Sequence, residues 1–159
     1  MRAIGVDVGG VIIEPADDDE DTSFFGEHYL RTPPMPGVFE ALATLAGAFD
    51  QVHVVSKCGP DTERRTREWL THHDFFARTG VAVDHLHFCR RRPDKAPIAA
   101  GLGLTHFVDD RLEVLGYLTT VRHRYLFRPR LAEIARHAEH LPHVHRVSNW
   151  PELVAAIVG

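Results

Sequence analysis

The chain has 159 residues, of which 44% are hydrophobic and 25% are charged. This is the length of one ordinary globular domain, and the composition excludes a disordered chain. Lys and Arg total 18 against 22 for Asp and Glu, so the formal net charge of −4 indicates neither nucleic acid nor a membrane as partner. No apolar run is long enough for a transmembrane helix, and the N-terminus lacks the apolar core of a signal peptide. Two cysteines do not form a disulfide framework, so we expect a reduced, cytoplasmic protein.

Apolar runs alternate with amphipathic segments along the chain. Strands are expected at residues 3–8, 52–56, 85–89, 105–108, 121–127 and 144–147. Helices are expected from Gly37, at 61–73, around Pro97 up to Gly103, at 111–118, at 130–140, and from Pro151 with Ser148 or Asn149 as the capping residue. Residues 14–36 are polar and proline-rich, and they predict one long loop. The alternation predicts an α/β fold: a three-layer, Rossmann-like parallel sheet of about five to six strands with helices on both faces, in one domain over 1–159.

Polar side chains follow several predicted strands or begin a helix. These residues are Asp7, Ser56, Lys57, Lys95, Asp109 and Asp110. In an open α/β sheet, ligands bind outside the carboxyl ends of the strands, so we expect these side chains at one edge. Carboxylates that face each other favour a hard cation such as Mg²⁺, and a lysine with a hydroxyl suits a phosphate. This combination predicts a nucleophilic phosphoryl-transfer site.

The order of these residues resembles the haloacid dehalogenase superfamily of phosphohydrolases. The segment IGVDVGGVI at 4–12 is similar to its nucleophile motif, with Asp7 as nucleophile. VHVVS at 52–56 is similar to the second motif at Ser56, and Lys95 to the third. HFVDDR at 106–111 is similar to the fourth, at Asp109 and Asp110. A response-regulator receiver domain uses similar residue types, but its acidic pair follows the first strand and its lysine comes last.

The resemblance implies a Mg²⁺-dependent phosphatase that hydrolyses a phosphomonoester through an aspartyl-phosphate on Asp7. Asp7 and Lys95 would then be catalytic residues. Mg²⁺ would be held by Asp7, Gly9, Asp109 and Asp110. The substrate phosphate would be bound by Ser56, Lys57, Lys95, and the backbone at Gly9 and Gly10.

Gly9 departs from the family pattern, because most of these phosphatases carry a second Asp at that position. That side chain protonates the leaving group and later activates water, and such general acid–base catalysis contributes roughly 10²–10⁴ in rate. Glu14, Glu27 and His28 are candidate substitutes, although loop polar residues are mostly solvated. The alternative function is therefore a binding or regulatory module of the same fold that has lost turnover.

The chain has no room for the substrate-selecting cap domain of many superfamily members. An open site implies a large substrate with an exposed phosphate, a phosphorylated small molecule, or a second copy of the chain that closes the site. Two charge runs flank it in sequence: Asp17 to Asp21 in the loop, and Arg90 to Arg92 before Lys95. Arg90 to Arg92 either bind further substrate anions or form a solvated basic turn. Arg111 is expected to pair with the neighbouring acidic residues.

Twelve histidines are present, and three ligand-type residues alternate along one predicted strand. His85, His87 and Cys89 would point to one face, where Cys58 or His106 would complete a Zn²⁺ site. The spacing matches no closed zinc motif, so ordinary surface polar residues are the favoured interpretation.

Overall fold

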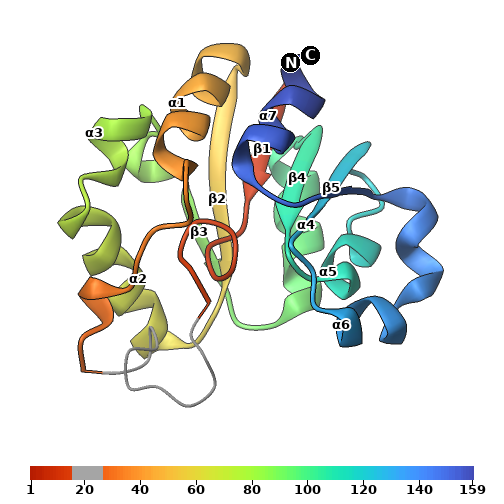
Figure 1. Ribbon diagram of the computed structural model, residues 1–159, viewed down its shortest axis with the longest axis horizontal. Coiled ribbons are helices and arrows are strands. Elements are labelled where there is room, and N and C mark those ends of the chain that lie inside the picture. The colour runs from red at the N-terminus through yellow and green to blue at the C-terminus, as the bar shows by residue number, and fades with distance from the viewer. Residues whose placement is uncertain (16–26) are drawn as a thin grey trace.

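A six-stranded sheet forms the centre of the computed structural model, which describes residues 1–15 and 27–159 (Figure 1). The strands of the described chain are β1 (Ala3–Val6), β2 (Gln51–Lys57), β3 (Leu86–Cys89), β4 (His106–Asp109), β5 (His123–Phe127) and β6 (His145–Val147). They are all parallel, in the order β3-β2-β1-β4-β5-β6. The predicted α/β fold with a parallel sheet is confirmed.

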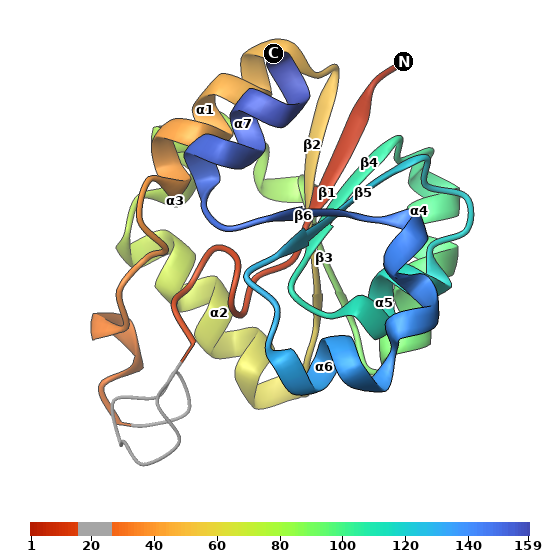
Figure 2. The same cartoon turned by 45° about the vertical axis from the view of Figure 1, so that its right-hand side comes forward.

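Helices cover both faces of the sheet, as Figure 2 shows. They are α1 (Val38–Ala48), α2 (Pro60–His72), α3 (Phe75–Thr79), α4 (Lys95–Leu102), α5 (Leu112–Tyr117), α6 (Leu131–Arg136) and α7 (Trp150–Val158). Helices α1, α2, α3 and α7 share one apolar core with the sheet, and α4 and α5 share the other. Neighbouring strand residues such as Val54 and Val55 enter opposite cores, which explains why the strands read as nearly continuous apolar runs.

Two fully buried tryptophans tie the loops around the sheet to the helices. The indole of Trp69 on α2 donates to the carbonyl of Thr32 at 2.9 Å. The indole of Trp150 on α7 donates to the carbonyl of Val11 at 2.8 Å, in the turn that follows β1. Both N–H groups find a partner in the interior, so the loop after β1 is held in place from two sides.

Three local features differ from the sequence prediction. Helix α3 was not expected, because its five residues are too few for a periodic pattern; it begins after Asp74, whose φ of 52° reverses the chain. The predicted helix at 130–140 splits into α6 and a 3₁₀ segment over Ala138–His143 that contains Pro142. A 3₁₀ turn over Tyr29–Arg31 lies within the predicted loop 14–36. Asn149, not Ser148, caps α7 by accepting from the Glu152 amide at 2.8 Å.

The acidic run Asp17 to Asp21 lies outside the described residues. Between β1 and β2, and between β2 and α4, the described segments contain α1, α2, α3, β3 and 3₁₀ turns, and no cap domain. In residues 1–15 and 27–159, no helix is long and apolar enough to cross a membrane.

His106 on β4 leads to a prediction about stability in acid. Its ring is buried against Phe49 and His123, and burial lowers its pKa from 6.5 to about 4. Between pH 6.5 and about 4 the unfolded chain therefore binds a proton that the folded chain does not, so stability falls as the pH falls through this window. Between pH 7 and 4.5, the free energy of unfolding should fall in both proteins. We expect the fall in His106→Phe to be smaller than in the wild type by on the order of 1–3 kcal/mol.

Urea unfolding of both proteins across this pH range measures the effect. The same carboxyl groups titrate in each protein, so the difference between the two curves isolates His106. Thr105 keeps its hydrogen bonds to the backbone of Ala3 in the variant. His143→Gln, which changes an exposed histidine, should follow the wild-type curve. Parallel curves for wild type and His106→Phe would contradict the prediction.

Candidate active site

The carboxyl ends of three central strands converge at one edge of the sheet. β1 lies between β2 and β4, and Val6 is in register with Val54 on one side and Val108 on the other. Asp7, directly after β1, continues this register by donating its amide to the Val108 carbonyl at 3.0 Å. Asp109 ends β4, so the two carboxylates reach the same edge from adjacent strands.

Lys95 joins these carboxylates from the first residue of α4. Its ammonium lies 2.9 Å from Oδ1 of Asp7 and 2.8 Å from Oδ2 of Asp109. The three side chains are 3%, 12% and 0% exposed. Burial alone would lower the pKa of the Lys95 ammonium, but the charges of Asp109 and Asp7 outweigh it and the pKa is raised. Lys95 therefore stays charged and holds the two carboxylates in place.

Asp110 adds a third carboxylate. Carboxylate oxygens of Asp7, Asp109 and Asp110 lie within 4.8 Å of one another. Burial raises the pKa of the Asp109 and Asp110 carboxyl groups, and the charge of Asp7 raises both further. Three acidic groups thus lie together while one ammonium contacts two of them, and a divalent cation would offset the remaining negative charge. The donors are all oxygens, which suits a hard ion such as Mg²⁺.

Ser56 and Lys57 occupy the end of β2, beside β1. The Ser56 side chain is buried and Lys57 is exposed. The structure therefore brings Asp7, Ser56, Lys95 and Asp109 to the predicted edge, with Lys57 at its outer rim. Lys95 was expected to bind phosphate. Its position between two carboxylates shows that it also balances their charge.

Gly10 and Gly9 differ in what they contribute. Gly10 has φ +77°, and a Cβ there would lie 2.5 Å from Oδ2 of Asp110. Only glycine fits this conformation beside the carboxylate. The Gly10 amide already donates to the Ile13 carbonyl at 2.9 Å, so its part in the site is conformational. Gly9 is exposed, and a Cβ there would meet nothing within 4 Å. The place of the usual second Asp is open space.

The candidate substitutes for that Asp are not joined to the site. Glu27 and His28 are exposed, and Glu14 is half-buried. Among the described residues, none of them makes a hydrogen bond or ion pair with Asp7 or Asp109.

The basic run before Lys95 is engaged in ion pairs with the protein itself. The carboxylate partners are Glu63 for Arg90 at 3.0 Å, Asp94 for Arg91 at 3.7 Å and Glu113 for Arg92 at 3.1 Å. Arg90 also donates to the carbonyl of Cys58 at 2.8 Å. These pairs favour a structural role for the run over substrate binding.

Arg111 does not form the ion pair with Asp109 or Asp110 that the sequence predicted. Its guanidinium pairs with Glu133 at 3.8 Å, and not with the acidic residues beside it in sequence. Its backbone amide, however, donates to Oδ1 of Asp109 at 2.9 Å. The Arg111 side chain instead reaches Glu133 on α6.

The side chains of His53, His85 and His87 pack against one another. His53 on β2, which the sequence analysis did not single out, is buried; its ring stacks on His85 at 4.1 Å and hydrogen-bonds His87 at 2.9 Å. His85 lies in a 3₁₀ turn before β3, and Cys89 is buried at the strand's end. Within 1–15 and 27–159, none of the groups of three converging metal-binding side chains contains these residues or His106. The expectation of ordinary surface polar residues is wrong in one respect, because Cys89 is buried and His85 and His87 are half-buried.

Comparison with known proteins bears on the fold. No family model and no curated protein matches the chain. Solved structures do match it along nearly its whole length. A haloacid dehalogenase-like family hydrolase from Xanthomonas campestris is 12% identical, with 99% of this chain and 95% of that chain covered and a TM-score of 0.62. The cobalt-bound deoxy-D-mannose-octulosonate 8-phosphate phosphatase from Haemophilus influenzae is 16% identical, with 99% and 87% covered and a TM-score of 0.57.

A third structure, a putative 3-deoxy-D-manno-octulosonate 8-phosphate phosphatase from Vibrio cholerae, is 12% identical, with 98% and 84% covered and a TM-score of 0.52. Similarity at these identities concerns the fold. The chain has the fold of haloacid dehalogenase-like hydrolases, as the order of its motifs led us to expect.

Proposed function

We propose that the protein is a Mg²⁺-dependent phosphatase that hydrolyses a phosphomonoester through an aspartyl-phosphate on Asp7. The observation that carries this proposal is the meeting of the Asp7, Asp109 and Asp110 carboxylates at the carboxyl edge of the sheet, with the Lys95 ammonium bound to the first two. The fold shared with solved phosphatases, one of them cobalt-bound, supports both the reaction and the divalent metal.

Each residue then has a part that its geometry permits. Asp7 attacks phosphorus, and the bond from phosphorus to the leaving oxygen breaks with its electron pair on that oxygen. Lys95 holds Oδ1 of Asp7 and so orients the carboxylate. Asp7, Asp109, Asp110 and the Gly9 carbonyl would hold Mg²⁺, which when bound offsets the charge of the transferring phosphoryl group. Ser56 and Lys57 bind the phosphate oxygens. Water then attacks the aspartyl-phosphate, releasing phosphate and restoring Asp7.

An aryl phosphate is the appropriate first substrate. Its leaving group needs little protonation, so the open space at Gly9 matters least there. We expect release of inorganic phosphate that depends on added Mg²⁺ and stops with EDTA. Absence of turnover of any activated phosphoester with Mg²⁺ present would refute the proposal. The second candidate, a binding module without turnover, is favoured by the same open space at Gly9 and would then stand.

Restoring the missing acid should raise the rate. Gly9 has ordinary backbone angles and free space around its Cβ position, so Gly9→Asp should be accommodated without strain. We expect turnover of alkyl phosphates to rise by roughly 10²–10⁴, and turnover of aryl phosphates to rise less. Steady-state rates on the two substrate types measure the difference. Gly9→Asn, with the same shape and no transferable proton, is the matched control; an unchanged rate in Gly9→Asp would mean that another acid already serves.

The proposal extends to the setting of the enzyme. Cys58 and Cys89 are free, buried thiols, which is consistent with a reducing compartment, and we propose the cytoplasm. The absence of a cap domain in the described chain favours a substrate whose phosphate enters an open site, or a second copy of the chain that closes it.

A further inference from the structure

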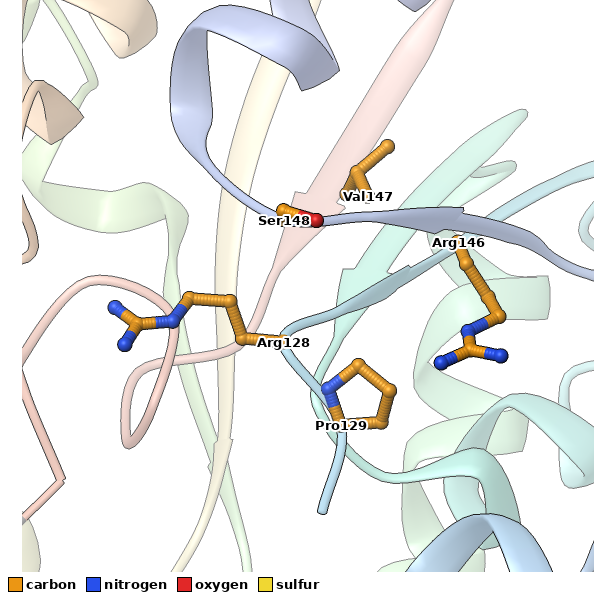
Figure 3. Close-up of a pocket in the computed structure, with 5 residues that line it drawn as sticks. All are labelled: Arg128, Pro129, Arg146, Val147 and Ser148. Carbon is orange, nitrogen blue, oxygen red and sulfur yellow. The ribbon is translucent and has the colours of Figure 1, made fainter. Parts of the chain in front are cut away.

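An open pocket of about 460 Å³ lies at the carboxyl ends of β5 and β6. It is lined by Arg128, Pro129, Arg146, Val147 and Ser148. Figure 3 shows Pro129 between the two arginines, whose guanidinium groups extend to opposite sides of it. The pocket is therefore flanked by positive charge on two sides. The sequence analysis did not single out either arginine.

Neither guanidinium has a carboxylate partner among the described residues. All three arginines of the run before Lys95 do, as does Arg111. In the described chain, the Arg128 guanidinium donates to the sulfur of Met35, at 3.0 Å from Nη1. The side chain of Glu152 on α7 accepts from the amide of Ser148, which lines the pocket, at 2.9 Å. Within residues 1–15 and 27–159, no ion pair therefore neutralises either guanidinium.

The backbone at Arg128 is held in an uncommon conformation. Its φ is 42°, in the left-handed region that costs a non-glycine residue on the order of 1–3 kcal/mol. The conformation is locked by the Arg128 amide, which donates to the Val147 carbonyl at 3.0 Å, and by Pro129 after it. The Arg128 side chain is directed toward Met35, whose own amide donates to Ile12 in the loop after β1. Through Met35, the Arg128 side chain is therefore linked to the loop after β1.

The pocket opens at the same sheet edge as Asp7. Adjacent strands lie about 5 Å apart, and β5 is two strands from β1, with β4 between them. The arginines therefore stand on the order of 10–15 Å from Asp7. This separation suits a substrate that places its phosphate at Asp7 and a second group in the pocket.

We propose that this pocket binds a second anionic group of the substrate, a carboxylate or a phosphate. Guanidinium groups bind both of these anions through charge-assisted hydrogen bonds. The proposal deepens the proposed function and rests on it, because it assigns the substrate class to doubly anionic phosphomonoesters. It also gives a protein without a cap domain a means to select its substrate.

Direct binding tests the pocket without turnover. The full ¹⁵N-labelled chain, free of metal, is titrated with acetate and separately with inorganic phosphate while the arginine Nε–Hε resonances are followed. We expect a saturable shift of the Arg128 and Arg146 resonances with at least one anion, and the responding anion identifies the source of the charge. Arg146→Gln should abolish the saturable shift at Arg128. Arg122 lies exposed at the opposite end of β5 and reports nonspecific effects; shifts no larger than those of Arg122 would overturn the proposal.

Kinetics then connects the pocket to the substrate. Two aryl phosphates are compared, one of which carries a carboxylate on a flexible chain. We expect the ratio of kcat/KM for the carboxylated to the plain substrate to fall about tenfold in Arg146→Gln and to stay unchanged in Arg122→Gln. An equal ratio in Arg146→Gln and wild type would overturn the proposal. If the protein turns over substrate but shows no saturable shift, only the proposal of anion binding in the pocket is refuted. If it shows a saturable shift but no turnover, only the proposed phosphatase activity is refuted.

Discussion

Replacing Asp7 by Asn is expected to lower the release of phosphate from an aryl phosphate by about 10³-fold or more, because it removes the nucleophile of the covalent step. The variant should also lose a second signal. Wild-type protein incubated with acetyl phosphate and Mg²⁺ should gain the mass of one phosphoryl group, and more so because Gly9 supplies no side chain to activate water. Asp7→Asn should gain none. Mass spectrometry and a phosphate-release assay measure the two effects.

Folding provides the control for this variant. Asn keeps the Oδ1 atom that accepts from Lys95 at 2.9 Å, and it removes one of three neighbouring carboxylates. Asp7→Asn should therefore unfold at nearly the wild-type temperature. Phosphate release at more than about a tenth of the wild-type rate, or phosphorylation of the Asn variant, would show that Asp7 is not the nucleophile.

Replacing Lys95 by Met is expected to lower stability as well as activity. The ammonium lies between two carboxylates that are 12% and 0% exposed, and no other cation replaces it in the described structure. Removing one partner of a buried ion pair costs about 3–5 kcal/mol, because the remaining charges are left uncompensated. For a domain of this size that corresponds to a fall in Tm of roughly 6–20 °C.

Thermal unfolding with and without Mg²⁺ measures the effect and tests its cause. If unbalanced carboxylate charge is the cause, Mg²⁺ should raise the Tm of Lys95→Met by more than that of the wild type. Lys57→Met removes a lysine that is exposed at the same edge, and its Tm should stay close to wild type. A Tm for Lys95→Met equal to that of Lys57→Met would contradict the prediction.

Much of the fold and of the acidic site followed from local patterns. Apolar runs closed by Asp7, Ser56 and Asp109 placed polar groups at strand ends, and parallel strands bring those ends to one edge. The predicted helix at 61–73 corresponds to α2, whose Trp69 and Leu70 are fully buried. Helix α3 was not predicted, because its five residues are too few for a periodic pattern. Its residue Phe75 is nevertheless fully buried in the core.

Other features depend on contacts between residues far apart in the chain. Lys95 was expected to bind phosphate, but only the folded chain shows its ammonium shared by Asp7 and Asp109. Arg111 pairs with Glu133 on a later helix, although the sequence places it beside the acidic pair. The rule that located the acidic site, polar residues directly after a strand, would also have selected Arg128.

The sequence by itself determined which predicted strands end in polar residues, the class of fold, and the absence of an acidic side chain at position 9. These features depend on residue type and on periodicity along the chain. Only the tertiary structure decided which charges neutralise one another. That question depends on distances of a few ångströms between side chains from different elements. Such distances distinguish Arg90 to Arg92, which have carboxylate partners, from Arg128 and Arg146, which have none in the described part of the chain. The acidic site could therefore be predicted from the sequence, while the basic pocket beside it could only be found in the fold.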